Sequence, residues 1–164
     1  GVPVARPLSC LVLLQGVLTL KEGHYEGGWF GEQWKASPSP EEARRMMKGA
    51  GETIAAVHVA ELTIGACTWS DLFWSEGACY LMDLDETRKR RIMPARFRAR
   101  DLARFAVSAE EAGVGADLLN HFLDSYLAVT CEERKEIVAR MQPHLKKQRI
   151  RRFQQDAITA QPLI

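Results

Sequence analysis

The sequence has no long hydrophobic run. No apolar stretch is longer than that of residues 10–14, which Gln15 interrupts, whereas a helix that crosses a bilayer needs about 20 apolar residues. The first residues also lack the basic segment, apolar stretch and small-residue cleavage site of a secretory signal. We therefore expect neither a transmembrane helix nor a signal peptide. The chain starts at Gly1 rather than Met, and whether it is a fragment stays open from the sequence.

A strong charge of one sign is also missing. The chain has 22 Lys and Arg against 21 Asp and Glu, a net charge of +1, which argues against binding a polyanion over the whole surface. We do not expect nucleic acid as a partner. The four cysteines form no C-x-x-C pair and have no histidine at metal-ligand spacing. This pattern predicts a reduced, cytoplasmic protein.

The first part of the chain predicts a hairpin, a linker and a helix. Two short runs rich in Val and Leu, residues 9–14 and 16–20, predict a β-hairpin. Glycines, prolines and aromatics crowd residues 22–38 and predict a loop or hinge. Ser39 is a suitable N-cap residue, and a proline and two acidic residues follow it. Together they predict a helix over residues 40–59.

The second part predicts a short hairpin followed by helices. Apolar residues 72–74 and 79–82 flank a Ser-Glu-Gly turn. Three helical patterns follow, over residues 94–111, 115–129 and 131–141, the last capped by Thr130 and followed by a basic tail. The order of elements predicts an α+β fold, and the length of 164 residues suits a single domain over residues 1–164.

The most informative segment runs from His58 to Asp85. It reads HVAELTIGACTWSDLFW and, after a short turn, CYLMDLD. In order and spacing it resembles the core of the bacterial lipopolysaccharide kinase family, of the Kdo and heptose kinase type, which has a protein-kinase-like fold. That core reads L-H-x-x-G-x-x-H-G-D-x-x-x-x-N, a short hairpin, then I-D-x-D. Residues 100–105, RDLARF, also resemble the family's R-D-L-A-R-L stretch.

The resemblance implies roles for individual residues. Asp71 falls where the family has Asn, and Asp83 falls where kinases have the first residue of Asp-Phe-Gly. Both are therefore implied ligands of magnesium, which holds the phosphates of ATP. His58 and Asp101 are implied supports of the catalytic loop, His58 as a buried histidine bonded to backbone and Asp101 by bracing the loop backbone.

The chain also departs from the family pattern. Ala66 occupies the position of the aspartate that engages the acceptor hydroxyl, so no catalytic residue is assigned. The glycine-rich loop, strand lysine and helix glutamate of a complete kinase would precede Gly1. The chain thus resembles a truncated, degenerate kinase, with a small-lobe hairpin remnant (1–21), a hinge (22–38) and a helical large lobe (39–164).

Simpler interpretations of these residues stay open. Asp83 also suits a strand end or a helix cap, and Asp71 a solvated turn. Two basic clusters are either solvated faces or contacts to an anionic surface: residues 88–91 with Arg96, Arg98 and Arg100, and residues 146–152.

The resemblance implies an ATP- and magnesium-dependent kinase that phosphorylates a sugar hydroxyl. Its partners would be ATP and an anionic glycolipid of the lipid A or core sugar type. It would then work in the cytoplasm, with peripheral contact to the inner face of the cytoplasmic membrane through the basic runs. Two alternatives remain: a pseudokinase or interaction module without catalysis, and a basic helical domain that binds an anionic surface.

Overall fold

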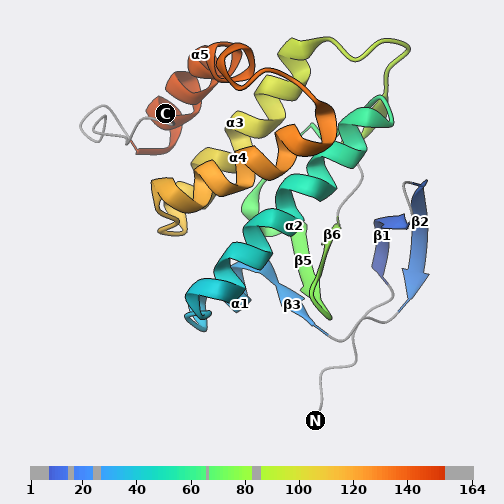
Figure 1. Cartoon of the computed structure of the whole chain (residues 1–164), viewed down its shortest axis with the longest axis vertical. Coiled ribbons are helices and arrows are strands. Elements are labelled where there is room, and N and C mark those ends of the chain that lie inside the picture. Colours follow the sequence, from blue (N-terminus) through green and yellow to red (C-terminus); the bar gives the residue numbers. More distant parts are fainter. Residues whose placement is uncertain (1–7, 15–16, 24–26, 66, 83–85, 154–164) are drawn as a thin grey trace.

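A computed structural model describes residues 8–14, 17–23, 27–65, 67–82 and 86–153 (Figure 1). The strands are β1 (Leu8–Leu14), β2 (Val17–Gly23), β3 (Gly28–Trp29), β4 (Leu62–Thr63), β5 (Leu72–Ser75), β6 (Ala78–Leu81) and β7 (Arg88–Lys89). The helices are α1 (Phe30–Lys35), α2 (Pro40–Val59), the 3₁₀ turn η1 (Trp69–Asp71), α3 (Ala95–Glu111), α4 (Ala116–Thr130) and α5 (Arg134–Phe153). The predicted α+β fold, mainly helical with small sheets, is confirmed.

Both predicted hairpins are present. Strands β1 and β2 pair antiparallel over their whole length, and β5 pairs with β6 from Leu72↔Leu81 to Ser75↔Ala78. The larger sheet has the order β2-β1-β6-β5-β3, in which β1 meets β6 through the single pair Leu11↔Leu81. Strands β4 and β7 form a separate two-stranded sheet. Figure 1 shows the β1–β2 hairpin at the opposite edge from the C-terminal helices.

The segment predicted as a loop or hinge contains β3 and α1. Phe30 at the start of α1 is fully buried, and its ring meets those of Trp69 and Trp74 edge-on, with centroids 5.0 and 6.1 Å away. Aromatic burial of this kind outweighs the helix-breaking tendency of the neighbouring glycines. The glycines and prolines therefore mark the ends of short elements rather than one continuous loop.

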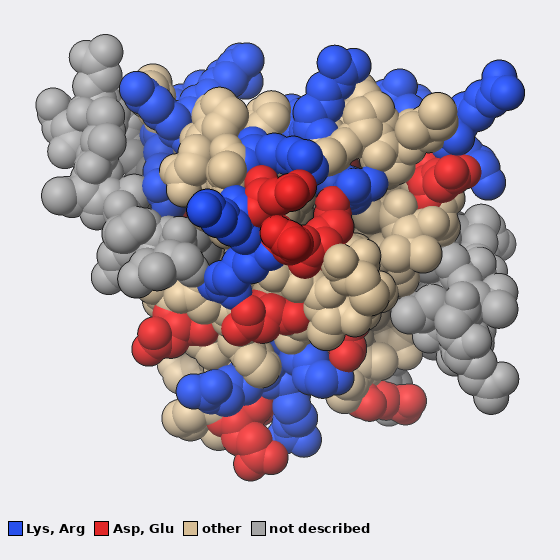
Figure 2. Space-filling view, turned by 45° about the horizontal axis from the view of Figure 1, so that its top comes forward, with Lys and Arg blue, Asp and Glu red and all other residues tan. Residues whose placement is uncertain are grey.

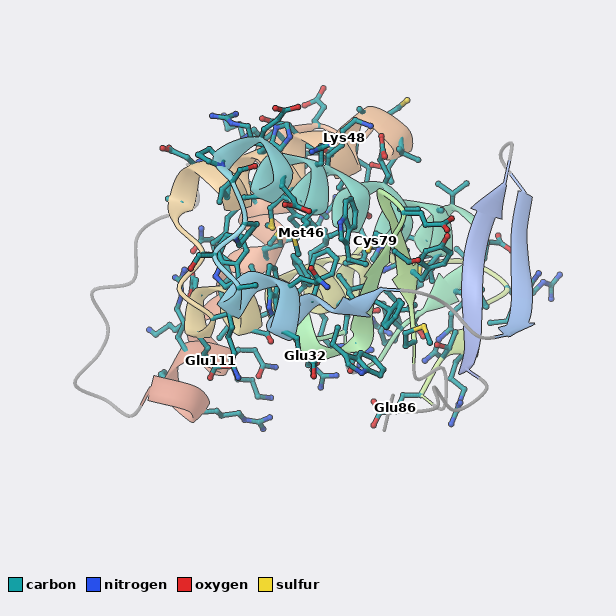
Figure 3. All side chains as sticks on the ribbon, turned by 90° about the horizontal axis from the view of Figure 1, so that it is seen from below. Glu32, Met46, Lys48, Cys79, Glu86 and Glu111 are labelled. Atoms are coloured by element: carbon teal, nitrogen blue, oxygen red, sulfur yellow. The ribbon has the colours of Figure 1, made fainter. Side chains whose placement is uncertain are left out.

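Helix α2 begins and ends where the sequence predicts. The Ser39 hydroxyl accepts a hydrogen bond from the Glu42 N–H at 3.2 Å, and Pro40 opens the helix. Met46 lies inside, between α2 and the strands, whereas Lys48 lies on the outer side of the helix (Figure 3). Gly51 lets α4 come close, because a Cβ there would lie 2.5 Å from the Phe122 carbonyl oxygen.

Helices α3 and α4 lie within one residue of their predicted bounds, but the start of the last helix was predicted wrongly. Thr130 does not cap it; Thr130 is the last residue of α4, and its hydroxyl donates to the Tyr126 carbonyl oxygen at 3.2 Å. Cys131 follows with φ of 56°, in the left-handed conformation that ends many helices. Helix α5 begins only at Arg134.

Helix α5 is also longer than predicted. It continues past Pro143 to Phe153, so most of the predicted basic tail is helical. Met141 and Leu145 are buried on either side of the proline. Arg149 in the next turn pairs with Glu110 of α3. These contacts with the rest of the fold hold the last turns in place. Among the helices described, none is long and apolar enough to cross a membrane.

Candidate functional site

The loop between β4 and β5, residues 64–71, carries most of the motif and lies along α3. Three polar residues of α3 contact its backbone: Asp101, Arg104 and Ser108. Their spacing of three and four residues places them on one face of the helix. One face of α3 therefore holds the loop from its start to η1.

Asp101 is fully buried and bonds to the start of this loop. Its Oδ2 atom accepts hydrogen bonds from the Ile64 N–H at 2.9 Å and the Gly65 N–H at 3.4 Å. The other carboxylate oxygen accepts a hydrogen bond from Arg100 Nη2 at 3.3 Å. A buried carboxylate bonded by several N–H groups holds them in a fixed geometry. Asp101 therefore contacts the loop backbone, and its role as a support of a catalytic loop stays a prediction.

Arg104 and Ser108 fix the next peptides of the loop. The Arg104 guanidinium donates to the Gly65 carbonyl oxygen. The Ser108 hydroxyl accepts from the Trp69 N–H at 2.9 Å. The sequence motifs predict a role for neither residue. Their helical spacing from Asp101 is the signal that could have identified them.

Gly65 is suited to this clamp by its backbone conformation. Its φ is +86°, in the left-handed region that glycine adopts without strain. A Cβ there would lie 2.8 Å from Glu86 Cβ and 2.9 Å from the Glu86 carbonyl oxygen. Glu86 therefore packs directly on the loop at a position that only glycine allows.

His58 lies behind the loop, and its partners are side chains rather than the backbone. Its Nδ1 shares a hydrogen bond with the Tyr126 hydroxyl at 3.0 Å, and its Nε2 lies 3.6 Å from Asp101 Oδ2. Tyr126 also donates to Glu132 at 3.4 Å, and Glu132 pairs with Arg98 at 2.7 Å. Burial raises the pKa of Tyr126, so its hydroxyl stays protonated. A chain of polar groups thus runs from the loop to Arg98.

Asp71 closes the loop as part of η1. Its Oδ2 accepts hydrogen bonds from the Thr68 N–H at 2.7 Å and the Thr68 hydroxyl at 2.9 Å. Its carbonyl oxygen accepts from the Met82 N–H at 2.7 Å, which extends the β5–β6 pairing by one residue. Asp71 therefore lies opposite the last described residue before Asp83.

The other two motif positions, Ala66 and Asp83, lie outside the residues that the structure describes. Within the described ranges, no group of three or more His, Cys, Asp or Glu side chains could hold a metal ion. These ranges supply one of the two predicted magnesium ligands, Asp71, whose carboxylate has the oxygen chemistry that this ion prefers.

Cys67, next to Ala66, has the environment of an unreactive thiol. It is fully buried, and burial raises its pKa well above the ordinary value of 9.0, with further contributions from the charges of Asp101 and Asp71. The reactive form of cysteine is the thiolate, which this environment disfavours. The thiol therefore contributes packing to the loop rather than a nucleophile.

Comparisons with known proteins agree with this arrangement. The family model described as "Lipopolysaccharide kinase (Kdo/WaaP) family" matches residues 29–126, which is more than half of the chain. A solved structure titled "WaaP in complex with acyl carrier protein" matches with a TM-score of 0.58 and 19% identity. The match covers 78% of this chain and 60% of that one, so this chain spans less than two thirds of its structural relative.

A search of curated protein sequences finds no match. The structural match shows a protein-kinase-like fold, and the family match covers α1 to most of α4, including the loop held by α3. The chain belongs to the lipopolysaccharide kinase (Kdo/WaaP) family.

Proposed function

We propose that this chain is a lipopolysaccharide-kinase-like domain that transfers the terminal phosphoryl group of ATP to a sugar hydroxyl of an anionic glycolipid. The observation that carries the proposal is the loop of residues 64–71, whose backbone is fixed by three polar residues of α3. Phosphoryl transfer depends on placed groups more than on covalent chemistry, so a rigid loop beside the phosphates suits it.

Asp71 and Asp83 are the proposed magnesium ligands. Thr68 orients the Asp71 carboxylate with two hydrogen bonds, and Met82, whose N–H bonds to the Asp71 carbonyl oxygen, directly precedes Asp83 in sequence. Magnesium bound there would neutralise charge on the ATP phosphates. His58 and Asp101 would support the loop without touching the nucleotide.

Ala66 limits the chemistry that we propose. A carboxylate at this position would accept a hydrogen bond from the acceptor hydroxyl and position it for attack. Alanine supplies no such group, so we expect slow transfer. The same residue favours the second candidate function, a pseudokinase or interaction module that keeps the fold without catalysis.

Nucleotide binding is tested by thermal unfolding of the whole chain with ATP, with and without Mg²⁺. A ligand at ten times its Kd stabilises a protein by about 1.4 kcal/mol, which for this size raises Tm by about 3–6 °C. We expect that rise only with both components, and its loss in Asp71→Ala and Asp83→Ala. Asp117→Ala, at an exposed position of α4, is the matched control. An unchanged rise in both variants would rule out the proposed ligands.

Catalysis is tested separately by Ala66→Asp. With ATP, Mg²⁺ and a lipid A or core glycolipid acceptor, we expect this variant to form phosphorylated product faster than the original chain. Mass spectrometry of the acceptor gives the readout. Unchanged nucleotide binding with no product from either chain would favour the interaction module.

The proposed location is the cytoplasm, at the inner face of the cytoplasmic membrane, where an anionic glycolipid and ATP meet. The basic segment at residues 88–91 supports this location through attraction to lipid phosphates.

A further inference from the structure

The connection from β7 to α3, residues 90–94, exposes a single large aliphatic side chain. Ile92 is 76% exposed, more than any other large hydrophobic residue that the structure describes. Its neighbour Met93 is only 8% exposed and anchors the connection in the fold. This connection arches over the upper right of Figure 1, beyond the end of α2. The isoleucine therefore projects from an anchored segment.

Arginines surround the base of this arch. The guanidinium groups of Arg90, Arg96 and Arg100 lie 4.6, 5.0 and 5.2 Å from the centre of the Phe97 ring. The ring face attracts each cation, whereas the three cations repel one another. One aromatic ring thus gathers three positive charges next to the exposed isoleucine.

Residues 88–100 contain more basic side chains than they form ion pairs. Within the described part of the chain, Lys89, Arg90, Arg91 and Arg96 form no ion pair. In the same stretch Arg98 is paired with Glu132 and Arg100 with Asp101. Arginines elsewhere on the C-terminal helices are also paired with acids: Arg134 with Asp124, Arg140 with Glu136 and Arg149 with Glu110. Figure 2 shows Lys and Arg side chains along the upper rim of the molecule, and acidic and basic side chains mixed over the middle and lower parts of the face.

We propose that residues 88–100 form a docking surface for an anionic phospholipid bilayer, in which Ile92 enters the headgroup region and the exposed basic residues Lys89, Arg91 and Arg96 contact lipid phosphates. An exposed aliphatic residue among cations suits this interface, because apolar burial and attraction to anionic lipids act together there. The charge complementarity of the unpaired arginines identifies an anionic partner, and the lone projecting isoleucine favours a bilayer over the surface of an acidic protein.

The docking surface adjoins the loop of residues 64–71. Arg100, which belongs to the surface, bonds to Asp101, and Asp101 bonds to Ile64 and Gly65. Docking would therefore bring the loop close to lipid headgroups. This inference rests on the proposed function only where it links docking to phosphorylation of a glycolipid near the loop. Lipid binding itself needs neither ATP nor catalysis.

The test is co-sedimentation of the whole chain with vesicles of phosphatidylcholine, alone or with 30% phosphatidylglycerol. We expect binding only to the anionic vesicles, and weaker binding as salt rises. Each basic residue near such a surface contributes about fivefold in affinity, so Arg91→Gln with Arg96→Gln should weaken binding about 30-fold. Ile92→Asp should weaken it at least tenfold, because it removes the apolar anchor and adds a negative charge.

The matched controls lie in the other basic segment. Ile150→Asp changes an isoleucine that is 40% exposed, and Lys146→Gln with Lys147→Gln removes two exposed positive charges. We expect both to retain binding within about threefold. Circular dichroism and Tm check that every variant is folded.

Three results would overturn the proposal. Equal binding to neutral and anionic vesicles would exclude recognition of lipid charge. Equal losses in the two sets of variants would indicate general attraction rather than a defined surface. No vesicle binding, or binding to an acidic protein alone, would exclude the bilayer. Since none of these assays measures phosphoryl transfer, failure here and failure of the proposed kinase activity are separate results.

Discussion

His58 Nε2 and Asp101 Oδ2 lie 3.6 Å apart, and both side chains are completely buried. The same carboxylate oxygen accepts hydrogen bonds from the loop at Ile64 and Gly65, while His58 bonds to Tyr126 on its other side. One pair of residues therefore joins α2, α3 and α4 behind the loop. The shape of the loop depends on this pair because buried polar groups tolerate few alternative arrangements.

Asp101→Asn should destabilise the protein by about 2–3 kcal/mol. An amide replaces the carboxylate that accepts the two loop N–H groups, and it turns donors toward groups that also donate. Urea unfolding measures the free energy of unfolding. Asp117→Asn, at an exposed position in the first turn of α4, should stay within about 0.5 kcal/mol of the original chain. A similar small effect for Asp101→Asn would contradict a bracing role.

Tyr126→Phe should cost about 1–2 kcal/mol, because it removes the hydroxyl that bonds to the buried His58 ring. The matched measurement is a double-mutant cycle with His58→Leu. In the His58→Leu background, Tyr126→Phe should cost about 1 kcal/mol less, since the shared hydrogen bond is already gone. Equal costs in the two backgrounds would show that the hydroxyl acts independently of His58.

Gly65→Ala should be more destabilising than Gly113→Ala, although both glycines have φ above 80°. A Cβ at Gly65 would meet Glu86 at 2.8 Å, whereas one at Gly113 has no atom within 4 Å. We expect about 1–2 kcal/mol for Gly113→Ala from backbone strain alone and at least about 1 kcal/mol more for Gly65→Ala from the clash. Thermal unfolding of both variants provides the comparison. Equal costs would mean that Glu86 moves away freely.

Local signals predicted the elements that local chemistry determines. Helix α2 has a serine cap, a proline and acids in its first turn, and its bounds match the prediction. Helix α1 lacks a side-chain cap and depends on Phe30 packing against two distant tryptophans, which no local pattern reveals. Thr130 has the side chain of a cap, but it is the last residue of α4 and its hydroxyl donates to the Tyr126 carbonyl oxygen one turn earlier.

The residues of the candidate site likewise fall into two groups: those that the sequence pattern indicated and those whose roles depend on tertiary packing. The motif order indicated Asp71 and Asp101 because a family pattern fixes their spacing. Arg104 and Ser108 contact the loop across about 40 residues of sequence, so their roles depend on how α3 packs. The Tyr126 partner of His58 lies 68 residues away, so the local sequence around His58, which favoured a backbone partner, does not reveal it.

The last prediction concerns pH. Burial raises the pKa of Cys67 in the folded protein well above 9.0. In the unfolded chain the thiol has its ordinary pKa, so above pH 9 the unfolded state loses a proton that the folded state keeps. The free energy of unfolding must then fall as pH rises, by up to about 1.4 kcal/mol per pH unit for one thiol.

Urea unfolding at pH 8 and pH 10 measures this fall. In Cys67→Ala the titrating thiol is absent, so the fall should be about 1.3 kcal/mol smaller than in the original chain. The control is Cys131→Ala, which removes an exposed thiol and should keep the full fall. Cys67→Ala removes packing atoms and lowers stability at both pH values, but only the difference between them reports on ionisation. An unchanged difference would mean that the Cys67 thiolate forms as readily in the folded protein as in the unfolded chain, and that the thiol beside the loop is available as a nucleophile.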